Sequence, residues 1–327
     1  NQQLLLRRGL SFVLKPSGGS DDRRLSSVDG HQPDMPALLC LCSSTVWEHR
    51  AHPWFMGNIR TSFLSLFGPC FIQVKRGFFR GGWLLLKILV LGSGAGGGSP
   101  QWTCCCPVCN RVRAGGPGTL RRTQSSIAVS GDGEDWFLCN ASPDLGQQII
   151  GISTLQANCD AGRQSPVVGA VLTNGDVDHV TGLLTLRESH PLAIYATGRV
   201  HKVLKDNKIF NVLNPDFVER RIMEMDKPID LATRDGKPSG IKVEPFTVPG
   251  KIALWLEDES AENFGSQPED TIALKISSTD GTSSFFYIPG CSEMLPELVE
   301  RLKGASLVFF DGTLWNDDEM KENQVGV

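Results

Sequence analysis

The chain has 327 residues, of which 40% are hydrophobic and 21% charged, and its formal net charge is -4. This composition suffices for one large domain or two ordinary ones, and the slightly acidic balance gives no case for nucleic acid as a partner. Ten cysteines are too few for a disulfide scaffold in a chain this long, and four of them fall within residues 104–109. They therefore indicate a reducing compartment and metal chemistry rather than disulfide bridges.

Residues 1–86 differ in character from the rest of the chain. They mix Arg, Ser, Gly and Pro with isolated apolar groups and show no sustained helical or strand period. We interpret them as a poorly structured extension without a domain of its own. The apolar run at 83–91 is interrupted by a lysine and is much shorter than the roughly 20 residues that span a bilayer. We therefore predict neither membrane insertion nor secretion.

From Lys87 the sequence becomes orderly. Residues 88–91 predict a buried strand that runs into the glycine-rich segment 92–97, which formally matches the dinucleotide-binding pattern G-x-G-x-x-G. A nucleotide-binding loop must open a helix, whereas another glycine, Pro100 and a group of cysteines follow here. A tight turn with close backbone approach is the favoured interpretation of the glycines, and a nucleotide site is the weaker alternative.

The cysteines form a C-x-C-x-x-C motif at Cys104, Cys106 and Cys109. Three thiolates from one short loop suit a closed tetrahedral zinc site once a fourth ligand arrives from elsewhere. We predict that they hold a structural zinc and that Cys105, which lies between them, need not take part. The alternative is a loop that is merely rich in cysteine.

Apolar and alternating segments predict a series of further strands. These strands cover residues 125–130, 136–140, 167–172, 192–197, 241–248, 252–256, 271–278, 283–288 and 306–310. Turn signals at 131–133 and 280–281 predict hairpins between the strands that flank them. Pro245 indicates that its strand lies at the edge of a sheet.

Short helices are predicted between some of these strands. One runs from Val180 and stops before Pro191, one covers residues 200–206, and one is capped by Ser292 and continues through Leu302. Two histidines near the first two helices, His190 and His201, are interpreted as surface or packing residues.

The polar segment 173–179 lies in the turn between a predicted strand and a predicted helix. Asp176, Asp178 and His179 could share one divalent cation there, because carboxylate and imidazole ligands suit zinc, iron or manganese. The alternative is that Asp176 or Asp178 simply caps the helix.

Asp311 directly follows the last predicted strand, in the manner of a ligand presented from a strand end. Two groups of strands, each followed by short helices and with carboxylates and a histidine in the connecting loops, describe an α/β (α+β) protein. The pattern is that of the metallo-β-lactamase-type four-layer αββα sandwich.

Longer motifs give the chain a more specific resemblance. The motifs are Gly92–Trp102, the cysteine triplet, Arg122–Ala128, Leu138–Asp144, Asp178–Leu184 and Asp311–Trp315. Together they closely resemble the pyrroloquinoline quinone (PQQ) biosynthesis protein B family over about residues 87–327. The resemblance implies a single domain over 87–327, truncated at its C-terminus, after the extension at 1–86.

The resemblance also implies a ligand set. The wider superfamily carries H-x-H-x-D-H in this loop, and Asn174 and Asp176 stand where its first two histidines would be. Asp178, His179 and Asp311 keep the positions of a second site, which implies a single metal centre with Asp176 as a further candidate. The family continues into a histidine-bearing segment that this sequence lacks, so we expect weak binding of the active-site metal.

The function implied by the resemblance is PQQ biosynthesis. The expected chemistry is hydroxylation of the tyrosine ring of a small peptide-derived precursor by iron(II), or another divalent metal, and dioxygen. Other PQQ biosynthesis proteins are expected partners, a homodimer is one compatible assembly, and the expected location is the cytoplasm. One alternative is a soluble carrier that assists transport of PQQ or its precursor to the periplasm. Another is a metal-dependent hydrolase, against which the missing histidines weigh.

Overall fold

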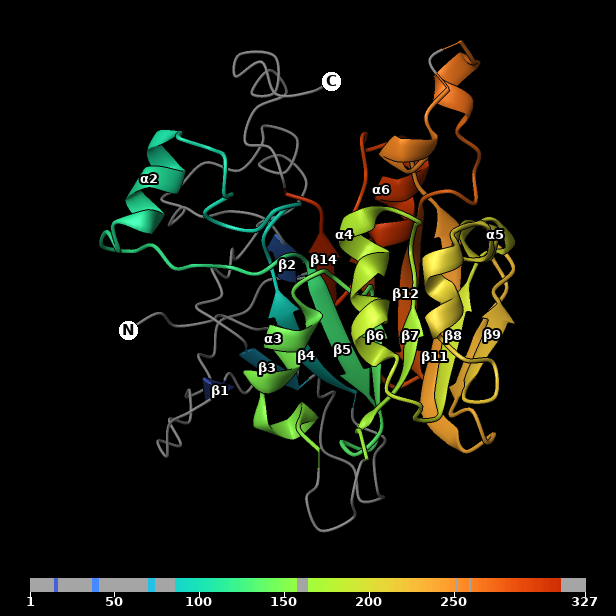
Figure 1. Cartoon of the computed structure of the whole chain (residues 1–327). Coiled ribbons are helices and arrows are strands. Elements are labelled where there is room, and N and C mark those ends of the chain that lie inside the picture. The colour runs from blue at the N-terminus through green and yellow to red at the C-terminus, as the bar shows by residue number, and fades with distance from the viewer. Residues whose placement is uncertain are drawn as a thin grey trace.

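The computed structural model describes residues 86–157, 164–250, 252–258 and 260–312, together with the backbone of three short earlier strands (Figure 1). The earlier strands are β1 (Lys15–Pro16), β2 (Ala37–Cys40) and β3 (Cys70–Gln73). Strand β3 pairs with both β1 and β4, and β2 pairs with β14, so these strands extend the two sheets of the following domain. The remainder of the predicted extension at 1–86 lies outside the described residues.

Eight strands form the first sheet, in the spatial order β1-β3-β4-β5-β6-β7-β8-β9. Its later members are β4 (Lys87–Gly92), β5 (Ser126–Ser130), β6 (Trp136–Cys139), β7 (Val167–Val171), β8 (Leu192–Ala196) and β9 (Val218–Ile222). Neighbours from β1 to β6 are antiparallel, and those from β6 to β9 are parallel. Parallel neighbours need crossover connections, which here carry helices onto one face of the sheet.

Six strands form the second sheet, in the order β10-β11-β12-β13-β14-β2. They include β10 (Ile229–Ala232), β11 (Pro238–Thr247), β12 (Ile272–Ser278), β13 (Ser284–Ile288) and β14 (Leu307–Phe310). The pairs from β10 to β13 are antiparallel, and β14 runs parallel to both of its neighbours. The β5–β6 and β12–β13 pairs are the two hairpins that the turn signals predict.

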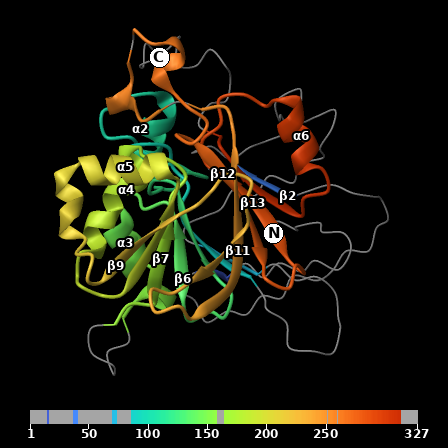
Figure 2. The same ribbon diagram turned by 90° about the vertical axis from the view of Figure 1, so that its right-hand side faces the viewer.

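Helices cover the outer faces of both sheets. Figure 2 shows α3 (Leu145–Ile150), α4 (Val177–Val180) and α5 (Gly198–Asp206) on the first sheet and α6 (Pro296–Leu302) on the second. In the part of the chain that the structure describes, five short 3-10 helices complete the connections: η1 (Ser153–Leu155), η3 (Thr181–Leu186), η4 (Lys208–Val212), η5 (Leu254–Leu256) and η6 (Glu262–Gly265). Within the described residues, no helix is long and apolar enough to cross a bilayer. The order of layers confirms the predicted αββα sandwich.

Strand β4 illustrates why the layers form. Ile88 and Val90 belong to the apolar core between the sheets, whereas Leu89 and Leu91 belong to the core beneath the helices. Successive side chains of a strand point to opposite faces, so a strand buried on both faces reads as a continuous apolar run. Burying each such side chain contributes about 1.5–3 kcal/mol, and these contributions hold the sheets together.

The predicted strand at 252–256 is wrong. The chain forms the turn η5 there, and the N–H of Leu256 donates to the carbonyl oxygen of Ala253 at 2.8 Å. Alternating apolar residues suggest a strand, but a strand needs a partner, and β11 already has β10 on one side and β12 on the other. Leu254 is therefore left 69% exposed.

The predicted edge position of β11 is also wrong, because β11 lies between β10 and β12. Pro245 is tolerated because β10 pairs with β11 only as far as Val243. The nitrogen and carbonyl of one strand residue face the same neighbour, and the carbonyl oxygen of Pro245 accepts from the N–H of Asp226 at 2.8 Å. The proline ring therefore faces a side where β10 has ended, and no ladder hydrogen bond is lost.

Helix α6 begins later than predicted. Leu295, not Ser292, is its N-cap residue, and Pro296 occupies the first helical position. Proline favours that position because its fixed φ angle suits a helix and its missing N–H would have no partner in the first turn. The N–H of Ser292 instead donates to the carbonyl oxygen of Pro249 at 2.9 Å.

His201 is a packing residue on α5. Its Nε2 lies 2.9 Å from the carbonyl oxygen of Arg221 and donates to it, and its buried Nδ1 has no hydrogen-bond partner among the described residues. Burial, helped by the positive charge of Arg220, lowers the pKa of His201. Burial likewise lowers the pKa of His190. Burial therefore favours the neutral form of both rings in the folded protein.

These lowered pKa values predict a loss of stability in weak acid. Below the ordinary histidine pKa of about 6.5, the unfolded chain binds more protons at these two histidines than the folded protein does. The free energy of unfolding therefore falls as pH drops from 7 towards 5. The slope is at most about 1.4 kcal/mol per pH unit for each such proton. The free energy of unfolding of the His201→Gln variant, measured by urea unfolding at a series of pH values, should depend less steeply on pH than that of the wild type. An unchanged slope would contradict this account of His201.

Candidate functional site

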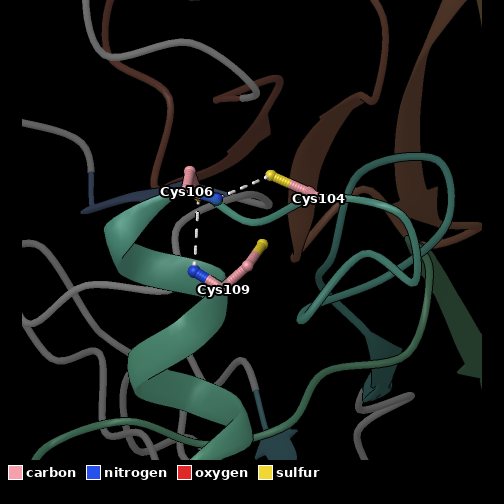
Figure 3. A group of neighbouring side chains, drawn as sticks. All are labelled: Cys104, Cys106 and Cys109. Atoms are coloured by element: carbon pink, nitrogen blue, oxygen red, sulfur yellow. Dashed lines mark hydrogen bonds between the residues drawn. The ribbon is translucent and has the colours of Figure 1, made fainter.

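The three predicted cysteine ligands lie together at the start of α2 (Pro107–Arg113), as Figure 3 shows. The Sγ atoms of Cys104, Cys106 and Cys109 all lie within 4.8 Å of one another. Among the described residues, no other group of three or more His, Cys, Asp or Glu side chains brings its ligand atoms this close. Cys105 is exposed and stands outside the group.

Hydrogen bonds shape this group of thiols. The N–H of Cys109 donates to Cys106 Sγ, and the N–H of Cys106 donates to Cys104 Sγ, each at 3.4 Å. Partial burial opposes ionisation of Cys106, but the hydrogen bonds from Cys109 and Cys104 outweigh it and lower the pKa of Cys106. Burial, helped by the two neighbouring sulfurs, raises the pKa of Cys109 to about 11. Without a cation, the three sulfurs cannot all hold negative charge at neutral pH.

Gln101 anchors the segment that leads into this group. Its side-chain oxygen accepts from the N–H groups of Thr103 and Cys104 at 2.8 and 2.9 Å. Its carbonyl oxygen accepts from the guanidinium of Arg113 at 2.6 Å, which joins the loop to the end of α2. The loop conformation is thus held by its own polar contacts.

The second predicted group lies in the turn between β7 and α4. Asp176 is the N-cap residue of α4, and its carboxylate accepts from the N–H of Val177 at 3.2 Å. The capping role that the sequence leaves open therefore belongs to Asp176. Burial, followed by repulsion from Asp178, raises the pKa of Asp176, while His179 and the N–H groups of Val177 and Leu254 oppose that rise.

His179 is buried within the same turn. Its ring nitrogen Nδ1 lies 2.8 Å from Asn174 Oδ1, and its backbone N–H donates to the carbonyl oxygen of Asp176 at 3.0 Å. Its own carbonyl oxygen accepts from the N–H of Ala141 at 2.7 Å. Both the ring and the backbone of His179 are therefore held by hydrogen bonds.

The glycine-rich loop after β4 lies against Asp178. A Cβ atom on Gly96 would lie 3.2 Å from Asp178 Oδ2, so glycine leaves room for that carboxylate. Gly97 and Gly98 have φ angles of 84° and 73°, which favour glycine. The strand before the loop pairs antiparallel with β5, and α2 begins only at Pro107. This arrangement agrees with a tight turn rather than a nucleotide-binding loop.

Gln124 and Asp144 support the glycine-rich loop. Gln124 Oε1 accepts from the N–H of Gly97 at 2.9 Å, and Asp144 Oδ2 accepts from both the N–H and the Nε2 of Gln124 at 2.9 and 3.1 Å. The sequence motifs contain both residues, but the sequence assigns neither of them a role. Only the contact between the segment before β5 and the start of α3 reveals the function of these polar side chains.

Asp311 follows β14 in the second sheet. Its N–H donates to the carbonyl oxygen of Ile288 at 2.7 Å, and its Oδ2 accepts from the N–H of Cys291 at 3.3 Å. The ligand atoms of Asp178, His179 and Asp311 do not all lie within 4.8 Å of one another. Burial, aided by the negative charges of Asp311 and Glu293, raises the pKa of Cys291 to about 11. Sequence reasoning missed Cys291, which a glycine and a strand end would have signalled.

A direct contact between the sheets links the two parts of the site. The N–H of Ile272 donates to the carbonyl oxygen of Thr173 at 2.9 Å, and Asn174 forms an isolated bridge with Thr271. A Cβ atom on Gly290 would lie 3.8 Å from the methyl group of Thr271, which places the segment before Cys291 near this bridge. The turn with His179 and the strand ends of the second sheet are therefore neighbours.

A beta-lactamase superfamily domain matches residues 135–326, which agrees with the sandwich and with the ligand types in its loops. The chain is a member of that superfamily. Within it, the chain belongs to the coenzyme PQQ synthesis protein B family.

Curated relatives carry this family identification. The chain is 47% identical over 242 residues to the coenzyme PQQ synthesis protein B of Bradyrhizobium diazoefficiens, covering 74% of this chain and 78% of that protein. It is equally similar, with the same coverage, to the protein of that name from Gluconacetobacter diazotrophicus. The crystal structure of Zn²⁺-bound PqqB from Methylobacterium extorquens superposes with a TM-score of 0.67 at 43% identity, over 73% of this chain and 77% of that one.

The contacts of Asp144 generate a prediction about the glycine-rich loop. The Asp144→Ala variant should lose about 1–3 kcal/mol of unfolding free energy, because it leaves the buried N–H of Gln124 without an acceptor. Asp144→Asn retains one oxygen acceptor and should lose less. Urea unfolding of the two variants and the wild type measures the difference. Equal stability of all three proteins would show that the Gln124 contacts are dispensable.

Proposed function

We propose that this protein acts in PQQ biosynthesis, where it hydroxylates the tyrosine ring of a small peptide-derived precursor with iron(II) and dioxygen. Membership of the coenzyme PQQ synthesis protein B family supports the pathway. The observation that carries the chemistry is His179, a buried imidazole bonded through Nδ1 next to the carboxylate of Asp178.

The donors fit a divalent metal in kind. With Nδ1 hydrogen-bonded to Asn174, the Nε2 of His179 is the ring atom left to act as ligand. Asp178 supplies a carboxylate from the adjacent position, and Asp311 is a candidate third ligand from the second sheet. Bound iron(II) with open coordination positions would supply the activation of dioxygen. The net reaction inserts one oxygen atom of dioxygen into an aromatic C–H bond and reduces the other to water, with two electrons and two protons from an added reductant such as ascorbate.

The same residues weigh against two-metal hydrolysis. Hydrolysis of that kind needs ligands for both metals on either side of the attacking oxygen. Asn174 hydrogen-bonds to His179, and Asp176 caps α4, so each of these side chains already has a structural contact. A single metal centre for oxidation is therefore the better supported assignment.

The cysteine group has a separate proposed role. Cys104, Cys106 and Cys109 would hold a structural zinc, because three convergent thiols next to one another are stabilised by a cation that takes them as thiolates. Because zinc does not change its redox state, a zinc ion held there would not itself take part in the oxidation.

Serine substitutions test the zinc assignment. Each of Cys104→Ser, Cys106→Ser and Cys109→Ser should lower bound zinc from about one equivalent towards zero and lower the melting temperature, because thiolate binding is coupled to folding. Cys105→Ser is the matched control, and its zinc content and melting temperature should stay close to those of the wild type. Equal zinc loss from all four variants, measured by elemental analysis, would refute these roles.

Oxygen labelling tests the function. The purified protein, supplied with iron(II), ascorbate and ¹⁸O₂, should convert a processed precursor that contains glutamate and tyrosine into a product with one ¹⁸O atom attached to the tyrosine ring. His179→Ala should reduce turnover by at least about a hundredfold, consistent with loss of a group essential to catalysis. His201→Gln is the matched histidine control and should keep turnover near that of the wild type.

Two other outcomes would overturn the proposal. Turnover with zinc alone and without dioxygen, yielding a hydrolysed product, would indicate a hydrolase. Tight binding of finished PQQ without any oxidation of precursor would indicate a carrier. Mass spectrometry of the products and equilibrium dialysis with PQQ separate these outcomes.

A further inference from the structure

We propose that Asn174 is the positioning residue that selects which ring nitrogen of His179 is available to a metal. Its side-chain oxygen lies between two groups of the same turn, 3.1 Å from the N–H of Asp176 and 2.8 Å from Nδ1 of His179. Both residues are more than nine-tenths buried: Asn174 is 8% exposed and His179 is 7% exposed. The inference rests on the proposed function only in taking His179 as a metal ligand.

The first step concerns the orientation of the Asn174 amide. An amide side chain can present either its oxygen or its NH₂ group to a neighbour, and its orientation must be decided from the hydrogen bonds. The backbone N–H of Asp176 can only donate, so the atom of Asn174 that faces it must be the oxygen. The amide orientation is thus determined independently of the histidine.

The second step concerns the tautomer of His179. Because Asn174 Oδ1 can only accept, Nδ1 of His179 must carry the proton that lies between them. In a neutral imidazole, a proton on Nδ1 leaves the lone pair on Nε2. Asn174 therefore sets the ring in the form that offers Nε2 as a ligand, as outer hydrogen-bond partners of metal-bound histidines commonly do.

The third step concerns what holds Asn174 itself. The preceding residue, Thr173, donates its N–H to Asn140 Oδ1 at 2.9 Å and accepts from Asn140 Nδ2 at the same distance. On the other side, Asn174 bridges to Thr271, which directly precedes β12 of the second sheet. Contacts with both sheets therefore hold the backbone that carries Asn174 Oδ1. The ring of His179 cannot turn without losing its hydrogen bond to that oxygen.

The tautomer can be read directly by ¹⁵N NMR of the full-length protein with ¹⁵N-labelled histidines. Spectra are recorded above the ordinary histidine pKa of about 6.5, and the His179 signals are assigned from their loss in His179→Gln. In the wild type, Nδ1 should carry the proton and Nε2 should not, and Zn²⁺ should shift the Nε2 signal. A wild-type ring protonated at Nε2 would overturn the proposal whether or not any variant folds.

Variants of Asn174 test the causal step. Asn174→Ala removes the acceptor and should raise the Nε2-protonated population and weaken Zn²⁺ binding at His179 by about 10–100-fold. Asn174→Asp keeps an acceptor oxygen and should retain the wild-type tautomer. An Asn174→Ala protein with both the tautomer and the Zn²⁺ affinity of the wild type would contradict the inference.

Asn214 provides a matched control for loss of the turn. Its Oδ1 accepts from the N–H two residues later, in Asp216, at 2.9 Å, just as Asn174 accepts from Asp176, but among the described residues no hydrogen bond is seen between it and a histidine. Asn214→Ala should leave the His179 signals and their response to Zn²⁺ unchanged, and a change as large as that of Asn174→Ala would show a merely structural effect. Because the NMR signals report no turnover, a correct tautomer in a protein that fails to oxidise precursor would reject the proposed function alone.

Discussion

The contact between the end of β7 and the start of β12 is the constraint on which the candidate site depends. Residues of both sheets share one apolar core, but the hydrophobic effect is non-directional and does not by itself define one register between the sheets. The hydrogen bond from Ile272 to Thr173 and the bridge from Asn174 to Thr271 are directional and define one register between them. His179 follows Thr173 by six residues and is hydrogen-bonded to Asn174, so it takes its position from that register.

A second feature of the structure is that amide side chains form hydrogen bonds with backbone groups around the candidate site. Gln124 receives the N–H of a glycine, Asn140 binds both polar groups of Thr173, and Asn174 accepts from a backbone N–H and an imidazole. Loops that leave a sheet have backbone groups without ladder partners, and buried groups of this kind need an acceptor or donor from elsewhere. These side chains supply it, so the loops can be irregular and still well defined.

Sequence reasoning succeeded where the signal is local. The strands of the sandwich are buried on both faces and read as apolar runs, and the cysteine group is brought together by the loop and first turn of one short helix. It failed where a partner lies far along the chain. The alternation at 252–256 could not reveal that β11 was already paired on both sides, and nothing near Asn174 in the sequence indicates Thr271. The role of Gln124 was missed for the same reason, because its partner Gly97 lies 27 residues away.

The connection of the two sheets also has a consequence for the order of folding. The β5–β6 and β12–β13 hairpins join neighbours in sequence. Asn174 and Thr271, by contrast, are separated along the chain by β8 and β9 of the first sheet and by β10 and β11 of the second. Contacts that close long loops form late, because the entropy of closure must be met first. Weakening this junction should therefore accelerate unfolding while leaving the rate of folding almost unchanged. The junction beside the candidate metal ligands should therefore affect the unfolding rate more than the folding rate.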